Sequence, residues 1–497
     1  MSDRRIRKIV ILGGGTAGWM SAAALAKVNA PPQFEVTLIE SDEIGIIGVG
    51  EATIPTIHWF NRLVGLDEAA FLRETRATFK LGIEFVGWNG EGSRYFHPFG
   101  RYGGPADQHM FFHRWIRTDL AGAAEPYPDF SLSTLAAMAG KFGPPANDPK
   151  SLFSTLGYAY HFDAGLYAAH LRRLAEAKGV KRVEGKVEKV EQHPETGFVT
   201  RLTTHRGEVL EGDLFIDCSG LRALLIEGTL KAGFEDWAHW LPCDRALAVP
   251  SEKIADPIPY TRATAHPFGW QWRIPLQHRT GNGLVYSSAF ARDDEVADTL
   301  LANLDGKPLA EPRLIRFQTG RRKKAWLKNV VAIGLSSGFL EPLESTSIHL
   351  IQSGIAKLLS LFPGKDCPEV TAEQFNKVYG EDTEAVREFL SLHYRRTEGR
   401  GEPLWRHCQE LSATAKEEHF TRTGRIVLGT DELFRESSWF AVMMGQGLRA
   451  EDYNPLLDSM NETENRAYLA QLRGQIAQAA ATLPSHQTYI DRLTGVR

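Results

Sequence analysis

The sequence predicts an α/β fold in which a Rossmann-type nucleotide-binding module is interlocked with a mostly helical C-terminal module. Three observations predict it. Residues 8–40 have the pattern of a strand, a glycine-rich loop, a helix and a second strand. Two more apolar strands, far along the chain, end at glycines near residues 220 and 334. Residues 370–497 have mostly helical character.

The glycine-rich loop has the spacing GxGxxG, which is formed by Gly13, Gly15 and Gly18. The first glycine of such a loop allows a tight turn, the second lets a pyrophosphate approach, and the third lets the helix pack on the strand. Thr16 and Ala17 belong to this loop, which leads into a helix expected from Trp19 to Val28 whose N-terminus favours phosphate. Glu40 ends the second strand, where an acid binds ribose hydroxyls. A glycine-rich turn without a nucleotide is the alternative, but the flanking strand, helix and acid favour dinucleotide binding.

The other elements follow in chain order. We expect a Gly/Ile/Pro-rich connection over 41–56, a helix over 58–76, a strand over 79–85, loops over 88–150, a helix over 160–177, strands over 181–220, a strand-rich stretch over 235–320, a strand over 328–334 and a helix over 345–362. The nucleotide-binding module would then be assembled from distant pieces. We assign to it 1–90, 160–230 and 320–365, with 91–159 and 231–319 as substrate-side insertions and 366–497 as a helical substrate module.

Bulk composition excludes several classes of function. The 497-residue chain has a net charge of −4 and no long Lys/Arg run, which argues against nucleic acid as a partner. Its four cysteines are far apart in sequence, which argues against a metal site or a disulfide framework and fits a reducing cytosol. We see no signal peptide and no stretch of about 18 apolar residues, so we expect a cytoplasmic protein with no membrane span.

A tryptophan pair stands in the middle of the chain, in Gly269-Trp270-Gln271-Trp272-Arg273-Ile274-Pro275. Residues two apart on a strand share a face, so the two indoles are expected side by side, with Pro275 ending the strand. By pattern alone, such a pair is a core or interface feature.

Together, the glycine loop and this segment resemble the flavin-dependent halogenases of the tryptophan-halogenase type, which carry an N-terminal GxGxxG and a central W-x-W-x-I-P. The resemblance implies an FAD monooxygenase-like fold and a reaction that uses reduced FAD, O2 and chloride or bromide on a small aromatic substrate. It also implies that Trp270 and Trp272 form a wall between the flavin and the substrate. No second GxGxxG is present, so we expect a separate NAD(P)H-dependent flavin reductase. A monomer or a homodimer fits the sequence equally well.

Further flavin contacts are implied by resemblance. The run Gly48-Val49-Gly50-Glu51-Ala52-Thr53 matches a family segment that straps across the flavin, although by itself it is only a flexible loop. The later glycine units resemble flavin-contacting segments of FAD enzymes. The cofactor residues expected from these segments are Gly50, Glu51, Ala52, Gly334 and Ile348.

Lys80 lies in a segment, 79–85, in which apolar residues alternate. By pattern alone Lys80 would face solvent. The segment is similar to that of the family's catalytic lysine, which implies that Lys80 receives hypohalous acid. An ammonium can hydrogen-bond this oxidant and a desolvated amine can form a haloamine, and the sequence leaves both open.

Glu344 comes just before a run of apolar residues at helical spacing, and Ser345 or Thr346 is expected as the N-cap. A carboxylate is favoured there by the helix N-terminus alone. The segment also resembles the family's E-S-T-G, which implies that Glu344 faces the substrate opposite Lys80 and orients the oxidant or takes the ring proton. The N–H groups of Thr346 and Ser347 would then bind halide. Ser347 replaces the usual glycine, so a Cβ crowds that position.

Substrate contacts are also implied by resemblance. His97 and Phe99 stand in His97-Pro98-Phe99-Gly100, similar to the family's H-x-F segment, although the same tetrapeptide recurs at 266–269. Trp439 lies in a second family-like segment. The stretch before it, 420–436, lacks the Tyr-Tyr pair that clamps free tryptophan in the family. Without charge-assisted contacts to a zwitterion, the substrate is expected to be indole or an indole derivative.

Two rival functions remain at this level. A flavin monooxygenase that hydroxylates an aromatic ring would share the fold but would not need the tryptophan wall, Lys80 or Glu344. A flavin-binding redox sensor or partner protein would show neither halide dependence nor a lysine requirement.

Overall fold

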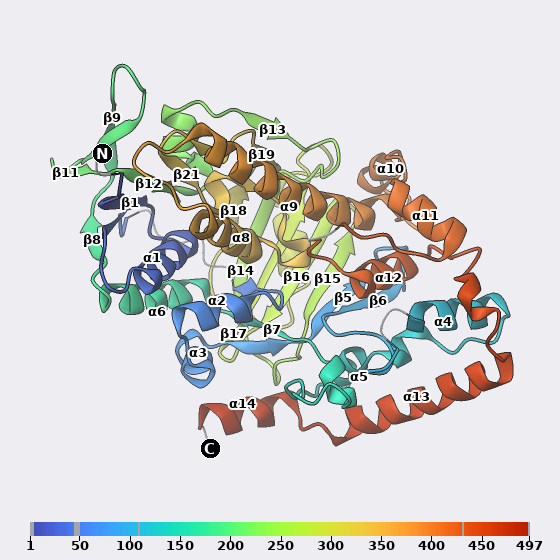
Figure 1. The fold of residues 1–497 in the computed structure, drawn as a ribbon. Coiled ribbons are helices and arrows are strands. Elements are labelled where there is room, and N and C mark those ends of the chain that lie inside the picture. The colour runs from blue at the N-terminus through green and yellow to red at the C-terminus, as the bar shows by residue number, and fades with distance from the viewer. Residues whose placement is uncertain (1–3, 44–49, 108–109, 430–431, 496–497) are drawn as a thin grey trace.

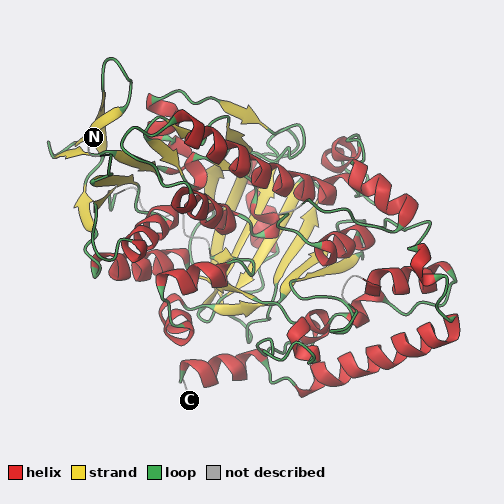
Figure 2. Ribbon diagram, in the orientation of Figure 1, coloured by secondary structure: helices red, strands yellow, loops and turns green. Residues whose placement is uncertain are grey.

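Two large sheets dominate the protein (Figures 1 and 2). The computed structural model describes residues 4–43, 50–107, 110–429 and 432–495. Over these residues the strands form one six-stranded sheet, one seven-stranded sheet and three sheets of three strands. Part of the strap-like run that includes Gly48 and Val49 lies outside the described residues.

The six-stranded sheet has the order β20-β21-β12-β1-β2-β8 and is parallel except for the β20–β21 pair. Its strands are β1 (Lys8–Leu12), β2 (Glu35–Glu40), β8 (Lys181–Glu184), β12 (Leu214–Asp217), β20 (Trp326–Leu327) and β21 (Val330–Ala332). Helices α1 (Thr16–Val28) and α6 (Ala164–Glu176) contact each other beside it. The three strands that end near the distant glycines, β1, β12 and β21, are direct neighbours. The predicted α/β fold class is confirmed, and strands from distant parts of the chain meet in this sheet.

The seven-stranded sheet has the order β18-β14-β17-β16-β15-β5-β6 and is antiparallel except for the β15–β5 pair. Its strands are β5 (Gly82–Val86), β6 (Arg94–Pro98), β14 (Arg245–Glu252), β15 (Thr261–His266), β16 (Gly269–Pro275), β17 (Arg279–Tyr286) and β18 (Arg313–Arg316). Its central strands, yellow-green in Figure 1, lie behind α8 (Ser347–Ser360) and the long α9 (Glu369–Arg395).

The remaining strands of the described residues form three small sheets. They are β3 (Glu51–Ala52), β7 (Ala159–Phe162) and β4 (Thr78–Lys80); β11 (Val209–Glu211), β10 (Val199–Thr204) and β9 (Val187–Gln192); and β13 (Phe234–Asp236), β19 (Gly320–Arg322) and β22 (Gly338–Phe339). The remaining α-helices are α2 (Ile57–Val64), α3 (Glu68–Thr75), α4 (Met110–Leu120), α5 (Leu132–Met138), α7 (Asp293–Ala302), α10 (Pro403–Gln409), α11 (Ala415–Thr423), α12 (Glu436–Gly445), α13 (Glu462–Thr482) and α14 (His486–Thr494). The C-terminal region is helical, as predicted.

Three local predictions were wrong. The helix expected over 58–76 is two helices, α2 and α3, because Gly65 adopts a left-handed φ of 80° and ends the first. The strand expected over 79–85 is divided between β4 and β5, which belong to different sheets. The region 88–150, expected as loops, contains β6, α4 and α5, whose apolar side chains are buried by packing on later helices.

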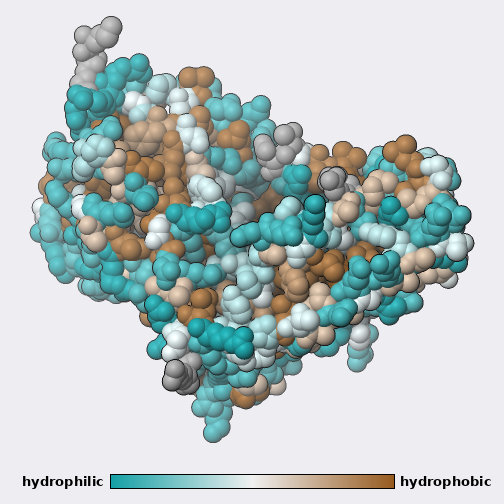
Figure 3. Space-filling view, turned by 60° about the horizontal axis from the view of Figure 1, so that its bottom comes forward, coloured by the Kyte–Doolittle hydropathy of each residue, from teal (hydrophilic) through white to brown (hydrophobic). Residues whose placement is uncertain are grey.

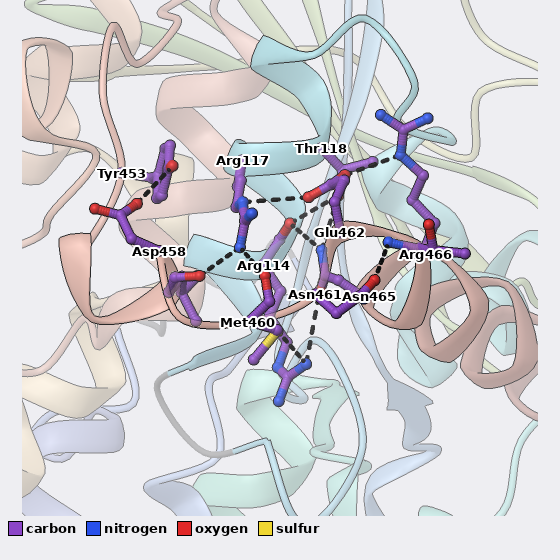
Figure 4. Close-up of polar contacts among 12 residues, drawn as sticks. Arg114, Arg117, Thr118, Tyr453, Asp458, Met460, Asn461, Glu462, Asn465 and Arg466 are labelled. Carbon is purple, nitrogen blue, oxygen red and sulfur yellow. Dashed lines mark hydrogen bonds and ion pairs between the residues drawn. The ribbon is translucent and has the colours of Figure 1, made fainter.

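Helix α4 also anchors the C-terminal region (Figure 4). Arg117 donates to the Met460 carbonyl at 3.1 Å and pairs with Glu462 at 3.2 Å. Asn465 of α13 donates to Thr118 Oγ1 at 3.1 Å. On its other side α4 packs against α12, where the Phe112 and Phe440 ring centroids lie 4.5 Å apart. Through its contacts with α4, helix α13 therefore supports α12.

On the face shown in Figure 3, hydrophilic residues predominate and hydrophobic residues are interspersed among them. Among the described residues, no helix combines the length and apolar character needed to cross a membrane.

Candidate functional site

The glycine loop after β1 opens onto a cavity of about 780 Å³. A Cβ on Gly13, whose φ is +111°, would stand 2.2 Å from the Cys218 carbonyl oxygen, and one on Gly18 would stand 1.8 Å from the Gly13 carbonyl oxygen. A Cβ on Gly15 would meet no atom of the described residues within 4 Å, so space is open there. Thus Gly13 makes the turn, Gly18 lets the helix approach, and Gly15 leaves room for a ligand.

The start of α1 faces this space, since Gly15 is its N-cap residue and Thr16 and Ala17 line the cavity. Glu40 also lines the cavity, and its carboxylate is held by Arg182 and by Arg172 at 3.5 Å. A helix N-terminus and open space at Gly15, with a carboxylate close by, fit the pyrophosphate and ribose of a dinucleotide such as FAD.

The other expected cofactor residues gather around the same cavity. Gly50, Glu51, Ala52 and Ile348 line it. Gly334, at a φ of +78°, packs so closely on the start of α1 that a Cβ there would lie 2.7 Å from Cβ of Ala17. Burial raises the pKa of Glu51 to about 7, and the Asp163 carboxylate adds to the rise. Glu51 therefore takes up a proton readily near neutral pH.

The tryptophan pair borders the cavity. Trp270 and Trp272 have ring centroids 6.2 Å apart on β16, which ends at Pro275 as expected. Trp272 lines the cavity, whereas Trp270 donates its indole N–H to Glu341 at 3.2 Å. Burial raises the pKa of Glu341 to about 7, although its hydrogen bonds oppose the rise. The pair therefore runs from the cavity wall into the protein interior.

Lys80 is fully buried, which overturns the solvent-facing arrangement that the alternating pattern favoured. Its ammonium donates to Ser345 Oγ at 2.8 Å and to the Thr53 carbonyl at 3.1 Å, and lies 4.8 Å from the Phe99 ring centroid. Burial lowers the pKa of Lys80 to about 7, while Glu344 acts in the opposite direction. Near neutral pH, both the ammonium and the amine are accessible at this position.

Glu344 is also fully buried, and two histidines hold it. Its carboxylate oxygens lie 3.0 and 2.9 Å from His97 Nδ1, and Oε1 lies 2.9 Å from His393 Nε2. Burial raises the pKa of Glu344, but the two histidines outweigh burial and lower it to about 2. The carboxylate is therefore ionised at neutral pH.

His393 lies between Glu344 and Tyr95. Its Nε2 is 2.9 Å from Glu344 Oε1, and its Nδ1 is 2.7 Å from the Tyr95 hydroxyl. Burial lowers the pKa of His393, although Glu344 opposes this fall. The imidazole ring therefore contacts both groups inside the protein.

The start of α8 differs in detail from the prediction. Thr346 is the N-cap residue, but no side chain caps the helix. Ser345 adopts a left-handed φ of 59° and directs its hydroxyl to Lys80. Thr346 is fully buried, and its hydroxyl has no hydrogen-bond partner in the described part of the chain. Ser347 lines the cavity. Thr346 thus offers an unused donor beside the helix N-terminus.

Aromatic rings enclose the substrate-side residues. His97 lies on β6, not in a loop, and its ring centroid is 5.7 Å from that of Phe389 and 6.3 Å from that of Phe99. Phe389 also meets Trp439 edge-on at 4.9 Å and stacks on Phe434 at 3.8 Å. The sequence-predicted residues His97 and Trp439 therefore share Phe389 as a neighbour.

The repeated tetrapeptide at 266–269 has another role. His266 and Gly269 pair at the hairpin between β15 and β16, and Phe268 belongs to a separate apolar cluster with Leu247 and Leu284. The repeat is therefore a hairpin turn, away from the Lys80–Glu344 site.

Several residues of this site were missed by the sequence analysis, namely Tyr95, Ser345 as a lysine partner, Phe389, His393 and Phe434. The one available signal was His393 itself, a polar residue between the apolar Leu392 and Tyr394 of a helical segment. Its partner lies in a different element, so spacing alone does not reveal the contact.

Comparison with known proteins gives one consistent result. The family model for tryptophan halogenase matches residues 8–462. The flavin-dependent halogenase BrvH from Brevundimonas sp. BAL3 is 46% identical, with 99% of this chain and 100% of that chain covered and a TM-score of 0.95. Xcc4156, a flavin-dependent halogenase from Xanthomonas campestris, is 44% identical, with 99% of each chain covered and a TM-score of 0.94. Tryptophan 6-halogenase ThaL of Streptomyces albogriseolus is 38% identical over 82% of this chain and 80% of its own length.

Proposed function

We propose that this protein halogenates indole or an indole derivative other than free tryptophan. The premise is that the chain belongs to the tryptophan halogenase family and is a flavin-dependent halogenase. Bound FAD, reduced by a separate reductase, supplies with O2 the oxidising power that turns chloride or bromide into hypohalous acid. The observation that carries the proposal is the enclosure of Lys80 and Glu344, both fully buried, beside the cavity that we propose holds the cofactor.

Lys80 is proposed to receive the hypohalous acid. Its Nζ is fixed by Ser345 and Thr53, so its third N–H, or its lone pair when deprotonated, is left for the oxidant. A pKa of about 7 keeps open both a hydrogen-bonded hypohalous acid and a haloamine. In either case the lysine delivers halogen at a defined point.

Glu344 is proposed to take the ring proton after the halogen adds. A carboxylate that stays ionised is a competent base for a cationic ring intermediate. His97 and His393 hold the carboxylate in place. These contacts support a catalytic Glu344 and a positioning role for His393.

The halide is proposed to bind at the start of α8. The helix N-terminus favours an anion, and the unpartnered Thr346 hydroxyl adds a donor. Ser347 carries a side chain where the family has glycine, so the bromide-to-chloride ratio must be measured. The tryptophan pair is proposed to separate this oxidant-forming side from the substrate.

The substrate class follows from what surrounds His97 and Trp439. Phe389 and Phe434 supply stacking faces. Lys416, whose ammonium contacts the Trp439 ring, is already paired with Glu432, with Nζ 2.8 Å from each carboxylate oxygen. A zwitterion would therefore gain few charge-assisted contacts.

The direct test is an indole assay with FAD, a flavin reductase and NADH, run with bromide, with chloride and without halide. Mass spectrometry should show a halide-dependent gain of one halogen. A gain of one oxygen that is independent of halide would support aromatic hydroxylation and overturn the proposal.

Free tryptophan is expected to be a poor substrate. Its kcat/KM should be at least about tenfold below that of indole, because a charged group buried without a partner costs about 1–3 kcal/mol or more, and about 1.4 kcal/mol corresponds to a tenfold change. Competition between the two compounds in one vessel, read by mass spectrometry, gives the ratio directly. Tryptamine and indole-3-acetate serve as controls that each retain one charge. A preference for tryptophan would contradict this substrate class.

Replacing His393 with phenylalanine should make halogenation more sensitive to acid. With one histidine lost, burial dominates and raises the pKa of Glu344 from about 2. The carboxylate is the active form. As the pH is lowered, the variant should therefore lose activity at a pH about 1–3 units higher than the native protein does. His393→Gln places an N–H donor beside Glu344 again and should return the pH profile of activity toward that of the native protein.

The measurement is kcat against pH for both variants, with FAD binding checked at each pH. His113→Asn, a buried histidine on α4, is the matched control. An equal loss of activity at every pH would mean that His393 only stabilises the fold.

A further inference from the structure

The ring of Trp439 makes a cation–π contact with a lysine. The Lys416 ammonium lies 4.1 Å from the ring centroid. The lysine side chain is only 10% exposed and Trp439 only 1%, so this contact is buried. A surface lysine normally keeps its ammonium in water. Lys416, near the start of α11, instead places its ammonium against Trp439 of α12.

Two acidic groups hold the ammonium there. Glu432 accepts from Nζ with both carboxylate oxygens at 2.8 Å, and Glu388 of α9 lies 4.0 Å away. The lysine is therefore fixed from two directions. The edge of the same Trp439 ring meets Phe389, which also contacts His97.

This arrangement addresses a chemical problem that follows from the proposed function. If indole is the substrate, the substrate side contains a second indole, Trp439, which belongs to the enzyme. Hypohalous acid attacks either ring by the same reaction. A ring C–H bond is replaced by a carbon–halogen bond, and the displaced proton leaves with the hydroxyl of the oxidant as water. Halogenation of Trp439 would damage the pocket.

A cation against the face of an indole opposes this reaction. It attracts the π electrons that an electrophile must share. It also repels the positive charge that develops on the ring as halogen adds. Glu432 and Glu388 offset part of this field, but the ammonium is the group in contact with the ring.

We propose that Lys416 protects Trp439 from halogenation, so that the oxidant is kept for the bound substrate. The proposal rests on the proposed function and adds a protective residue to it. A lysine that only joins α11 to the segment before α12 would give the same geometry. The two roles differ in which variants expose Trp439 to the oxidant.

Lys416→Met removes the charge and keeps the length of the side chain. The variant is incubated with bromide, FAD, reductase and NADH, without an aromatic substrate, and the Trp439 peptide is examined by mass spectrometry. Bromine at Trp439 should increase at least about tenfold over the native protein. Lys416→Arg keeps a cation and should resemble the native protein.

Glu432→Gln is the deciding control. It breaks the ion pair but leaves the ammonium, so a protective charge predicts no increase in bromination. A purely structural link predicts that Glu432→Gln and Lys416→Met behave alike, and that result would overturn the proposal. FAD binding and circular dichroism establish that each variant is folded.

A parallel titration with hypobromite, without FAD or reductase, separates this proposal from the proposed function. Faster bromination of Trp439 in Lys416→Met than in the native protein supports protection even if the enzyme brominates no indole. Equal bromination in both proteins, or none in either, overturns it.

Discussion

Lys80→Ala is expected to abolish halogenation while FAD binding and flavin oxidation continue. The buried ammonium is the group proposed to receive the oxidant, and removal of a preorganised donor of this kind costs about 10²–10³-fold in rate. Alanine also removes any haloamine route, so the loss should reach the upper end of that range or exceed it. Halogenated indole is measured by mass spectrometry, and NADH consumption and flavin oxidation are followed in the same reactions.

Lys357→Ala is the matched control. Lys357 lies on α8 and pairs with Asp382, away from Glu344, and its loss should leave product formation unchanged. Lys80→Arg keeps a permanent cation and separates the two lysine mechanisms. Its activity persists if hydrogen bonding suffices and is lost if an amine must form. Normal product from Lys80→Ala would refute the assignment of Lys80.

Glu344→Gln should lower kcat by about 10²-fold or more, since general base catalysis contributes about 10²–10⁴-fold. Glutamine has nearly the same shape but cannot take a proton from the ring. Glutamine is neutral, so it no longer stabilises the charged form of Lys80. The pKa of Lys80 should therefore fall below about 7.

A deuterium isotope effect tests the role of Glu344 directly. In the native protein, proton loss follows addition of the halogen, and deuterated indole should react at nearly the same rate as ordinary indole. In Glu344→Gln, proton loss becomes limiting and a primary isotope effect should appear. Glu84→Gln, at another buried carboxylate that pairs with Arg262 at 2.6 Å, is the control. Halogenation by Glu344→Gln at the native rate would exclude Glu344 as the base.

Local sequence was a reliable guide where backbone sterics decide the structure. The turn at Gly13 and the close helix approach at Gly18 are where a Cβ would collide with backbone atoms, so the spacing alone predicts them. Trp270 and Trp272 share a face because strand geometry requires it. Both features depend on residues close together in the chain.

Local sequence failed where packing between distant elements decides the structure. Alternation over 79–85 predicted one exposed face, but Lys80 and Glu84 are both buried, because β4 and β5 join different sheets. The helix α4 was missed, although Phe112 and Trp115 lie on its buried side. Glycines and prolines on both sides of α4 concealed a pattern that the contact with Phe440 makes evident.

The sequence by itself determined the α/β class, the glycine-rich turn, the tryptophan pair and the family resemblance, because each depends on short runs of residues with steric requirements of their own. Only the tertiary structure decided how Glu344 is held, since His97 and His393 reach it from β6 and α9. It also decided the pKa of Lys80 and the position of the Lys416 ammonium on Trp439. Burial and charge at these positions come from chain segments far apart in sequence, and no local pattern records which of them will meet.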